Sequence, residues 1–301
     1  MEYDIIRTGT IDADVVEANP IVFNGRLYLF EYIRDSDGDR PAYHAGETGG
    51  SYFRFLDVAA RTYTPAFGHG LHMGCALADN GKVYVTAVEN WGASRFYVME
   101  SSDLHHWSEP RVILEDPRWA GYNTSCCRAG DRFVMVFELG KPKELVGVPF
   151  TMFFAESADM RHFRMLPEAV FGRDFYTGAP MLRYFDGWFY FFYLDSRVLP
   201  GGYVTRVARS RDLKAWEIAP RPVLVPDEAA DRRIAPDAAP GAWRETVAGA
   251  EDRNASDIDM IAFEGRLEVV YSWGNQHGTE FLARGYVPDC DEAAFCRSFF
   301  A

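Results

Sequence analysis

Two aspartates stand at the head of an apolar stretch in NASDIDMIAFEG, residues 254–265. Asp257 and Asp259 alternate there with apolar residues, a pattern that predicts a buried β-strand. Buried carboxylates are rare, because a charge without a partner is costly to remove from water. A pair of them can do acid–base chemistry, in which one carboxylic acid donates a proton and an ionised partner attacks or activates water. These two residues are therefore the first candidates for catalysis.

A structural explanation of the same residues is also open. Asp257 can cap the turn that follows Asn254, since aspartate side chains often accept hydrogen bonds from nearby backbone N–H groups. Asp259 can form an ion pair with an arginine. The choice depends on the elements that position the two side chains.

The strand that contains the two aspartates continues into a tight hairpin that recurs along the chain. Asn-Gly and Asp-Gly pairs between apolar arms favour turns that reverse a strand. Hairpins turn near residues 24, 80, 130, 186 and 264, in PIVFNGRLYLFEY, ALADNGKVYVTAV, SCCRAGDRFVMVFE, MLRYFDGWFYFFYL and MIAFEGRLEVVYS. Five such units predict an all-β fold over residues 1–301, a single five-bladed β-propeller with four-stranded antiparallel blades.

A second repeat follows the third strand of three units. SSDLHHW, SADMRHF and SRDLKAW begin at residues 101, 157 and 210. In each, Ser or Asp is expected to cap the turn and the aromatic residue to pack on the next strand. The fifth unit lacks an evident fourth strand. We expect the strand-like N-terminal stretch YDIIRTGT, residues 3–10, to supply it and to close the ring.

The longest connection, residues 225–253, lies between the fourth and fifth units. It is rich in Pro, Ala and Asp, a composition typical of loops. Loops of this length are usually functional or disordered. The segment is therefore interpreted either as a lid, with Trp243 closing over a ligand, or as a solvated insertion without a role.

The composition limits the classes of function. The chain has 301 residues, is 48% hydrophobic and carries a formal net charge of −13, which argues against nucleic-acid binding. No apolar run is long enough to cross a membrane, and the acidic N-terminus does not resemble a signal peptide, so we expect a cytoplasmic location. The five cysteines are irregularly spaced, which favours a reducing compartment. No zinc-ligand spacing or phosphate-binding loop is present, so no cofactor is expected. The sequence does not indicate an oligomeric state.

The hairpins and the Ser-x-Asp turns resemble those of the five-bladed propeller glycoside hydrolases, the group of families 43, 32, 68, 62 and 117. The resemblance covers nearly the whole chain. It implies that three carboxylates project from inner strands into a funnel, as base or nucleophile on blade one, pKa modulator on blade two and general acid on blade three.

This sequence departs from the family pattern on each of those blades. Asn19-Pro20 stands where Asp-Pro is expected, HGLHMGC offers His72 without an acid, and GYNTSCC offers Asn123 in place of Glu. The resemblance also implies that a calcium or other ion can lie on the propeller axis. Asp259 is a candidate ligand for it, although no ligand spacing requires one.

Alignment of the hairpins by their turns shows which side chains share a level in the funnel. One level holds Asn19, Cys75, Ser125, Met181 and Asp259, and the level nearer the strand starts holds Glu17, Met73, Asn123, Ala179 and Asp257. The acids fall on blades one and five, which become neighbours when the ring closes. We therefore predict that Asp257 and Glu17 form the catalytic pair, with Asp259 deeper as a modulator of pKa. His277 is a further candidate proton donor, since its ordinary pKa of about 6.5 suits that role.

Candidate substrate-binding residues come from the starts of the inner strands and the loops beside them. Trp273 is expected to stack on a sugar ring, and Asn275 and Gln276 to bind hydroxyl groups. The remaining candidates are Asn19, His72, Asn123, Thr124, Glu138, Tyr176, Thr177 and Trp243. Glu138 ends the apolar run FVMVFE, so burial beside a basic group is the alternative for it.

Together these features favour a glycosidase that acts on a small oligosaccharide. The alternative is a carbohydrate-binding propeller without catalysis, which would keep the polar and aromatic funnel and lose the acids. A scaffold for protein partners comes third, since it would show exposed apolar patches instead. No nucleic-acid or membrane partner is expected.

Overall fold

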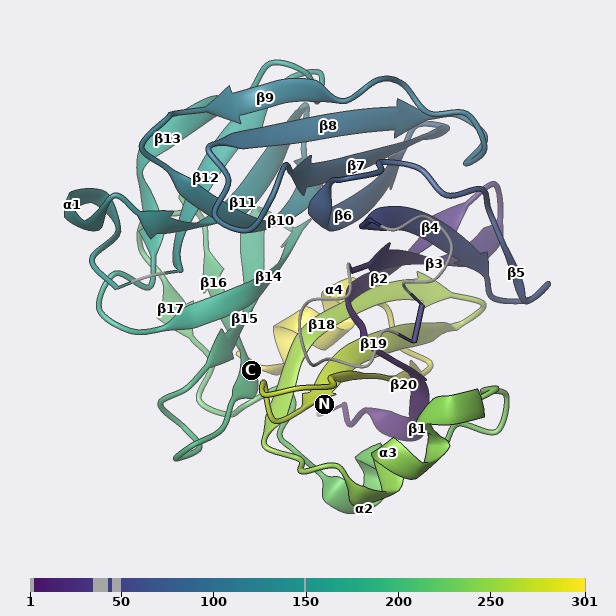
Figure 1. Ribbon diagram of the computed structural model, residues 1–301. Helices are drawn as coiled ribbons and strands as arrows, with labels where there is room; N and C mark the ends of the chain where they lie inside the picture. Colours follow the sequence, from purple (N-terminus) through teal and green to yellow (C-terminus); the bar gives the residue numbers. More distant parts are fainter. Residues whose placement is uncertain (1–2, 35–42, 45–49, 149, 301) are drawn as a thin grey trace.

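Five four-stranded antiparallel sheets surround a common centre, as the hairpin repeat predicts (Figure 1). The computed structural model describes residues 3–34, 43–44, 50–148 and 150–300. Blade one consists of β2 (Val15–Phe23), β3 (Arg26–Ile33), β4 (Tyr52–Asp57) and β5 (Thr62–Tyr63). Blade two consists of β6 (His72–Asp79), β7 (Lys82–Val88), β8 (Arg95–Ser101) and β9 (Arg111–Glu115). Blade three consists of β10 (Ala120–Ala129), β11 (Arg132–Lys141), β12 (Thr151–Ser157) and β13 (Arg164–Phe171).

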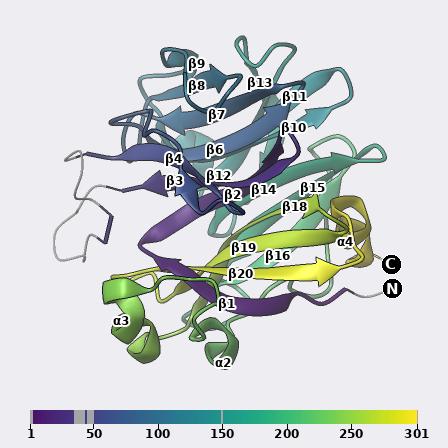
Figure 2. The ribbon, with the colours of Figure 1, turned by 90° about the vertical axis from the view of Figure 1, so that its right-hand side faces the viewer.

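The remaining two blades complete the ring. Blade four consists of β14 (Thr177–Phe185), β15 (Trp188–Asp195), β16 (Val204–Ser210) and β17 (Glu217–Ile218). Blade five consists of β18 (Asn254–Phe263), β19 (Arg266–Gly274) and β20 (Phe281–Pro288), with β1 (Ile6–Ala13) at its outer edge. The pairing of β1 with β20 joins the two ends of the chain, which Figure 2 shows side by side. The predicted closure of the ring by the N-terminal strand is confirmed.

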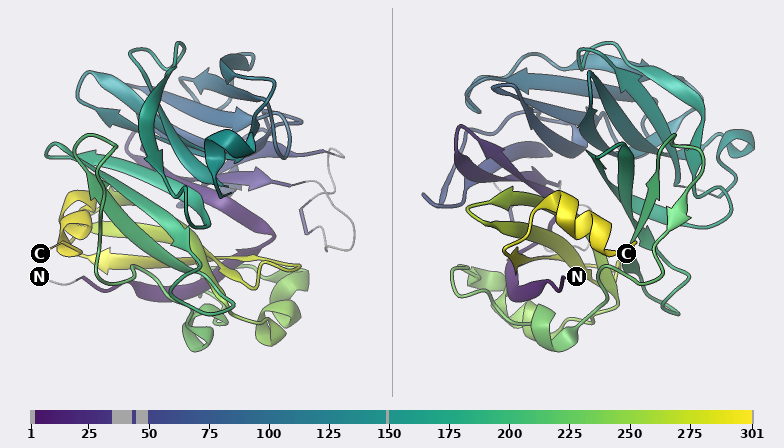
Figure 3. Two further views of the ribbon diagram at one scale, coloured as in Figure 1. Left: turned by 90° about the vertical axis from the view of Figure 1, so that its left-hand side faces the viewer. Right: turned by 180° about the vertical axis from the view of Figure 1, so that it is seen from behind.

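The short helices lie in connections and at the C-terminal end. They are α1 (Lys143–Val146), α2 (Glu228–Asp231), the 3-10 helix η1 (Gly241–Trp243), α3 (Arg244–Gly249) and α4 (Glu292–Ser298). The Asp291 side chain caps α4 by accepting the Ala294 N–H. Figure 3 shows α4 on the side of the propeller opposite to the viewer of Figure 1. Within the described part of the chain, no helix is long and apolar enough to span a membrane.

The inner hairpins turn as their sequences require. Asn24-Gly25, Asn80-Gly81, Asp186-Gly187 and Glu264-Gly265 all have positive φ at both positions. Such turns match the right-handed twist of the flanking strands. The register of these four hairpins is thereby fixed, and with it the level at which their inner-strand side chains enter the centre.

The Ser-x-Asp turns form the caps that the repeat predicts. Ser101 Oγ accepts the Leu104 N–H at 2.9 Å, and Asp103 Oδ1 accepts the N–H groups of His105 and His106, both at 2.8 Å. The turns at Ser157 and Ser210 use the same Asp-to-backbone bonds. The aromatic residue that ends each turn packs inward, as Trp107 does on Phe67 with ring centroids 3.9 Å apart.

The connection at 225–253 packs along the outside of blade five. Thr10 of β1 exchanges backbone hydrogen bonds with Arg233 and Ala235 at 2.7 and 2.9 Å, and Gly9 leaves room for this approach, since a Cβ there would lie 2.4 Å from Arg233 O. Figure 1 shows α2 and α3 beyond β1, away from the centre. This packing places the segment away from the funnel and does not support its interpretation as a lid over the funnel. Trp243 is buried in the apolar cluster beside blade five instead of closing over the funnel.

Candidate active site

The inner strands all carry an irregularity where they enter the funnel. Pairing with the second strand slips between Val16 and Asn19, His72 and Cys75, Gly121 and Thr124, Gly178 and Met181, and Ser256 and Asp259. In four blades the slip contains a non-glycine residue in the left-handed region, namely Glu17, Met73, Ala179 and Asp257, with φ between 48 and 52°. Such bulges re-aim side chains, and strained residues of this kind cluster at functional sites.

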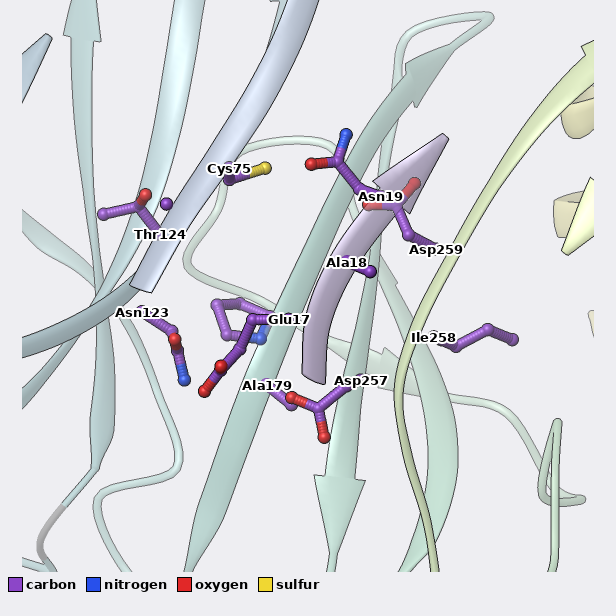
Figure 4. Close-up of a pocket in the computed structure, with 12 residues that line it drawn as sticks. Glu17, Ala18, Asn19, Cys75, Asn123, Thr124, Ala179, Asp257, Ile258 and Asp259 are labelled. Atoms are coloured by element: carbon purple, nitrogen blue, oxygen red, sulfur yellow. The ribbon is translucent and has the colours of Figure 1, made fainter. Parts of the chain in front are cut away.

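The acids among these residues meet in one pocket. Glu17 and Asp257, from adjacent blades, both line a narrow space of about 30 Å³ at the base of the funnel, together with Asp259. Figure 4 shows their side chains projecting into it from β2 and β18. Four of the five residues predicted to share a level, Glu17, Asn123, Ala179 and Asp257, line this pocket. The fifth, Met73, is buried and does not line it.

A buried arginine lies beside the pair. Arg34 follows β3, and its Nη2 donates to Asp14 Oδ1 at 2.5 Å. Burial opposes its charge, but Glu17 and Asp14 are close enough to raise the pKa of Arg34 above its ordinary value. Burial also raises the pKa of Asp257, against the lowering effects of the Ser256 hydroxyl and Arg34. Asp257 therefore keeps its proton more readily than an exposed aspartate.

Glu138 forms the wall behind Asn123. Glu138 is 2% exposed, and its carboxylate accepts the Ala179 N–H at 2.7 Å and lies 3.5 Å from Asn123 Nδ2. Burial raises its pKa well above the ordinary value, and the charges of Asp257 and Glu17 add to the effect. These partners are amides and not the basic group considered as the alternative for Glu138. Its contacts make it a support for Asn123 rather than a direct contact for substrate.

Two charged residues of the site, Glu280 and Arg34, are missing from the candidates drawn from the sequence. Glu280 is buried, accepts the Gln276 N–H at 2.5 Å and the Asn254 Nδ2 group at 3.2 Å, and its pKa is raised to about 7 by burial and then by Asp257. Arg34 directly follows the apolar run LYLFEYI, as Glu138 ends FVMVFE. A charged residue at the end of a buried second strand is the sequence signal that could have identified Arg34.

Asp259 lies deeper and has the ion-pair partner considered as its structural alternative. Arg183 Nη2 donates to Asp259 Oδ1 at 2.6 Å and to the Met260 carbonyl at 2.8 Å. Asp259 and Glu292 raise the pKa of the buried Arg183, which keeps its charge. The carboxylate also accepts the Met260 N–H at 2.7 Å. This pair ties blade four to blade five.

Several polar candidates hold neighbouring blades together. The Asn19 amide makes two 2.9 Å hydrogen bonds with the backbone of Ala76, and Thr124 Oγ1 lies 2.7 Å from Thr86 Oγ1. Both residues line the pocket but are buried. His72 lies between blades one and two, with its ring nitrogens 2.7 Å from Tyr32 OH and 3.3 Å from Ser51 Oγ.

Aromatic rings form an arc that runs from blade two to the start of blade four. Tyr122 contacts Trp91 and Phe150, and Phe150 contacts Tyr176, with ring centroids 4.8 to 6.5 Å apart. Tyr176 in turn contacts Tyr203. Burial and then the charge of Glu138 raise the pKa of Tyr176.

Two further expectations are wrong. Trp273 is fully buried, stacks on Phe281 and donates its indole N–H to Thr10 Oγ1 at 2.8 Å, so it cannot stack on a sugar. Thr177 is also fully buried and donates to the Phe150 carbonyl at 2.7 Å. Both lie within strands and not in the loops beside them, since Trp273 pairs with Ala255 and Phe281, and Thr177 pairs with Asp195.

The loop after β19 stands apart from the pocket. Asn275 Nδ2 donates to Glu251 Oε2 at 3.3 Å, and the His277 N–H donates to Asn275 Oδ1 at 2.9 Å. His277 is exposed, and neither it nor Gln276 lines the pocket of Glu17 and Asp257. Among the described residues, no three His, Cys, Asp or Glu side chains are grouped as a metal ion would require.

Comparisons with solved structures agree with this architecture. No protein-family model and no curated protein sequence matches the chain. A structure described as a glycoside hydrolase has a TM-score of 0.60 at 13% identity, covering 95% of this chain and 91% of its own. The α-L-arabinofuranosidase PaAbf62A from Podospora anserina, solved in complex with cellotriose, has a TM-score of 0.64 at 11% identity, covering 96% and 98%. The GH43 protein BlXynB from Bacillus licheniformis has a TM-score of 0.56 at 15% identity, and the match covers 96% of this chain but 56% of BlXynB.

At such identities the likeness establishes the fold. The chain is an all-β five-bladed propeller whose structural neighbours include glycoside hydrolases of families 43 and 62. The identity of its catalytic residues has to be argued from the site itself.

Proposed function

We propose that the protein hydrolyses a glycosidic bond in a small oligosaccharide, with Asp257 and Glu17 as the catalytic carboxylates. The observation that carries this proposal is the placement of both acids on left-handed bulges of adjacent blades, in one pocket. Two carboxyl groups that flank a bond are the machinery that glycoside hydrolysis needs. The fold shared with glycoside hydrolases supports the same class of reaction.

The electrostatics suggest how the two roles divide. Asp257, whose pKa is raised by burial, is suited to protonate the leaving oxygen. Glu17 interacts with the charge of Arg34 and is suited to act as the ionised partner that attacks the sugar or activates water. Asp259, bound to Arg183, acts as a structural and electrostatic support in this proposal.

The aromatic arc suggests where the rest of the substrate lies. Trp91 is largely exposed and Tyr122 and Tyr176 are half-buried, so their rings can face the apolar C–H side of sugar residues. The arc extends from blade two to the loops before blade four, opposite the acids of blades five and one. A short glycan that enters along the arc would present its end to Glu17 and Asp257.

The test is hydrolysis of a panel of nitrophenyl glycosides and short oligosaccharides by the parent protein, E17Q and D257N. We expect kcat to fall about 100- to 10,000-fold in each variant, the range seen for loss of a general acid or base. E264Q and D289N are matched controls, because they change exposed acids with the same left-handed backbone, φ 47 and 50°. Full activity in both E17Q and D257N would refute the assignment.

The second candidate function is carbohydrate binding without hydrolysis. The observation that favours it is Asn19, which occupies the place of the family's blade-one aspartate and is fully engaged with the Ala76 backbone. Under this alternative, oligosaccharides bind to the parent protein and no panel member is cleaved.

A further inference from the structure

A second and larger hollow lies between blades five and one, beneath the segment 225–253. Its volume is about 320 Å³, near the lower end of the range of about 300–1,000 Å³ for small-molecule sites. We call it the crevice. Its floor is aliphatic, formed by Leu27, Leu29 and Leu56 of blade one and Val270 of blade five. It shares no lining residue with the pocket of Glu17 and Asp257.

The crevice exists because aliphatic residues occupy this blade interface where large aromatic residues fill others. Phe55, Phe67 and Trp107 stack between blades one and two, and Phe154, Phe171 and Trp216 pack between blades three and four. The buried cluster between blades five and one is aliphatic apart from Tyr52. Tyr63 is the seventh residue of the turn that begins at Asp57, as Trp107 is the seventh residue of the turn that begins at Ser101. Unlike an interface aromatic, Tyr63 is 49% exposed, and it lines the crevice.

A carboxylate takes the place of an apolar residue in the crevice wall. The second strands begin at Arg26, Lys82, Arg132, Trp188 and Arg266, each paired with the last residue of the first strand. Five residues further along each strand stand Glu31, Ala87, Phe137, Tyr193 and Tyr271. Glu31 is 1% exposed and lines the crevice. A buried acid at a position that otherwise fills the core needs a reason beyond packing.

The charges around Glu31 are balanced. Arg54 Nε donates to Glu31 Oε2 at 2.7 Å, and the Arg54 guanidinium lies 3.7 Å from the Tyr63 ring centroid. His44 Nε2 lies 2.8 Å from Asp12 Oδ1, so this acid also has a partner. At the rim, Arg284 makes two 2.8 Å bonds to Asp237 of the covering segment. Each of these carboxylates already has a basic partner, so a cationic ligand would be left without a counter-ion. Arg61 also lines the crevice, but it is exposed, so water and salt screen its attraction for an anion.

We infer that the crevice binds a neutral polyhydroxylated ring, a single sugar unit. Hydroxyl groups would donate to Glu31 and Asp12 and accept from Arg284, while the C–H face of the ring lies on Leu29 and Val270. The carboxylates and their basic partners provide hydrogen bonds for the hydroxyl groups. The aliphatic floor, with Tyr63 at its edge, provides the apolar contact for the C–H face. The choice of a sugar rests on the proposed function, but the crevice does not depend on catalysis in the funnel.

The test is binding of D-glucose, D-galactose, D-xylose and L-arabinose, each alone, measured by calorimetry and saturation-transfer NMR. We expect at least one sugar to bind, and E31Q to weaken it at least tenfold, because the ring loses a charged acceptor. L27W, which fills the crevice with an aromatic as Phe133 and Phe189 do at the corresponding positions of blades three and four, should abolish binding. E156Q is the matched control, since Glu156 is another buried acid paired with arginine, on blade three.

D257N separates this site from the funnel and should keep the affinity of the parent protein. A lack of hydrolysis by the parent protein would refute the proposed function and leave this binding unchanged. The inference is overturned if none of the four sugars binds, if binding survives in both E31Q and L27W, or if D257N removes it. Since L27W changes only an aliphatic side chain, it keeps the test decisive should E31Q fail to fold.

Discussion

The funnel and the crevice are hollow for different reasons. In the funnel, backbone bulges turn Glu17 and Asp257 into a narrow space of about 30 Å³, and the polar side chains around them are held by neighbouring blades. In the floor of the crevice, β3 pairs with β4 and β19 with β20 without register shifts, and the space of about 320 Å³ remains because aliphatic residues replace aromatic ones. The first site is made by backbone conformation and the second by side-chain volume. Substitutions that keep the backbone conformation and change only the side chain should therefore affect the two sites differently.

The largest expected effect comes from D257G. Glycine adopts the φ of 50° found at Asp257 without strain, so the fold should be kept or slightly stabilised while the carboxylate is lost. We expect kcat to fall at least about 100-fold with no loss of thermal stability. Assays of hydrolysis and a thermal melt on the same sample check this. A179G, at φ 52°, is the control and should keep activity within about threefold.

The next effect concerns the role of Asp259. In D259A, Arg183 stays buried without its main partner, so we expect the free energy of unfolding to fall by about 3–5 kcal/mol. The double variant D259A/R183M should recover more than half of this loss, because it removes the isolated charge. Urea denaturation measures both. A D259A variant as stable as the parent protein would show that the pair does not join blades four and five.

Filling the crevice should stabilise the protein, in contrast to the loss of stability expected for D259A. We expect L27F to raise the free energy of unfolding by about 1 kcal/mol, because an aromatic ring occupies space that blades three and four already fill in this way. Chemical denaturation of L27F beside the parent protein is the measurement. A loss of stability instead would indicate that the crevice walls are packed too tightly to accept the ring.

The smallest effect is a pH dependence of the segment that covers the crevice. Burial and the neighbouring Asp231 raise the pKa of Asp252 to about 7 from an ordinary 3.8. The folded state thus keeps a proton that the unfolded chain has lost, and the free energy of unfolding falls as pH rises from about 4 to about 7. D252N removes this dependence. After allowance for partial solvent screening, we expect it to raise stability at pH 8 by about 1 kcal/mol, or about 2 °C in Tm.

At pH 4 the parent protein and D252N should melt at the same temperature, because Asp252 is then protonated in the folded state. Asp231 is held by Arg7 at 2.8 Å and Tyr271 at 2.5 Å, so both proteins keep that anchor. A difference between them that does not change with pH would assign the effect to packing and not to the proton.

The sequence predicts the propeller well because hairpin turns and Ser-x-Asp caps are local. Asn24-Gly25 and Ser101 determine their own conformations through nearby backbone groups, so the repeat can be counted without the tertiary structure. The level of Glu17 and Asp257 follows from counting residues back from those turns. The N-terminal strand could be assigned to blade five because that blade alone lacked a fourth strand.

Local turn signals could not predict which side chains beyond the bulges point to the centre and which point into the core. A slip between Ser256 and Asp259 changes which side chains of β18 point to the centre. Trp273 lies inside β19, paired with Ala255 and Phe281, and is buried in the core, whereas the sequence predicts a loop there. Arg34 and Glu280 depend on contacts between segments distant in sequence. The packing of 225–253 depends on Gly9, whose missing side chain leaves room for Arg233, a relation that composition does not reveal.

The central claim is that Glu17 and Asp257 flank the bond that is cleaved. The most direct test is a crystal structure of D257N soaked with an oligosaccharide that the parent protein hydrolyses. We predict that the glycosidic oxygen lies within hydrogen-bond distance of the amide that D257N introduces. Glu17 should lie on the other side of the sugar carbon, with the remaining rings along Tyr122 and Tyr176. An oligosaccharide bound with its glycosidic bonds away from both positions would contradict the claim.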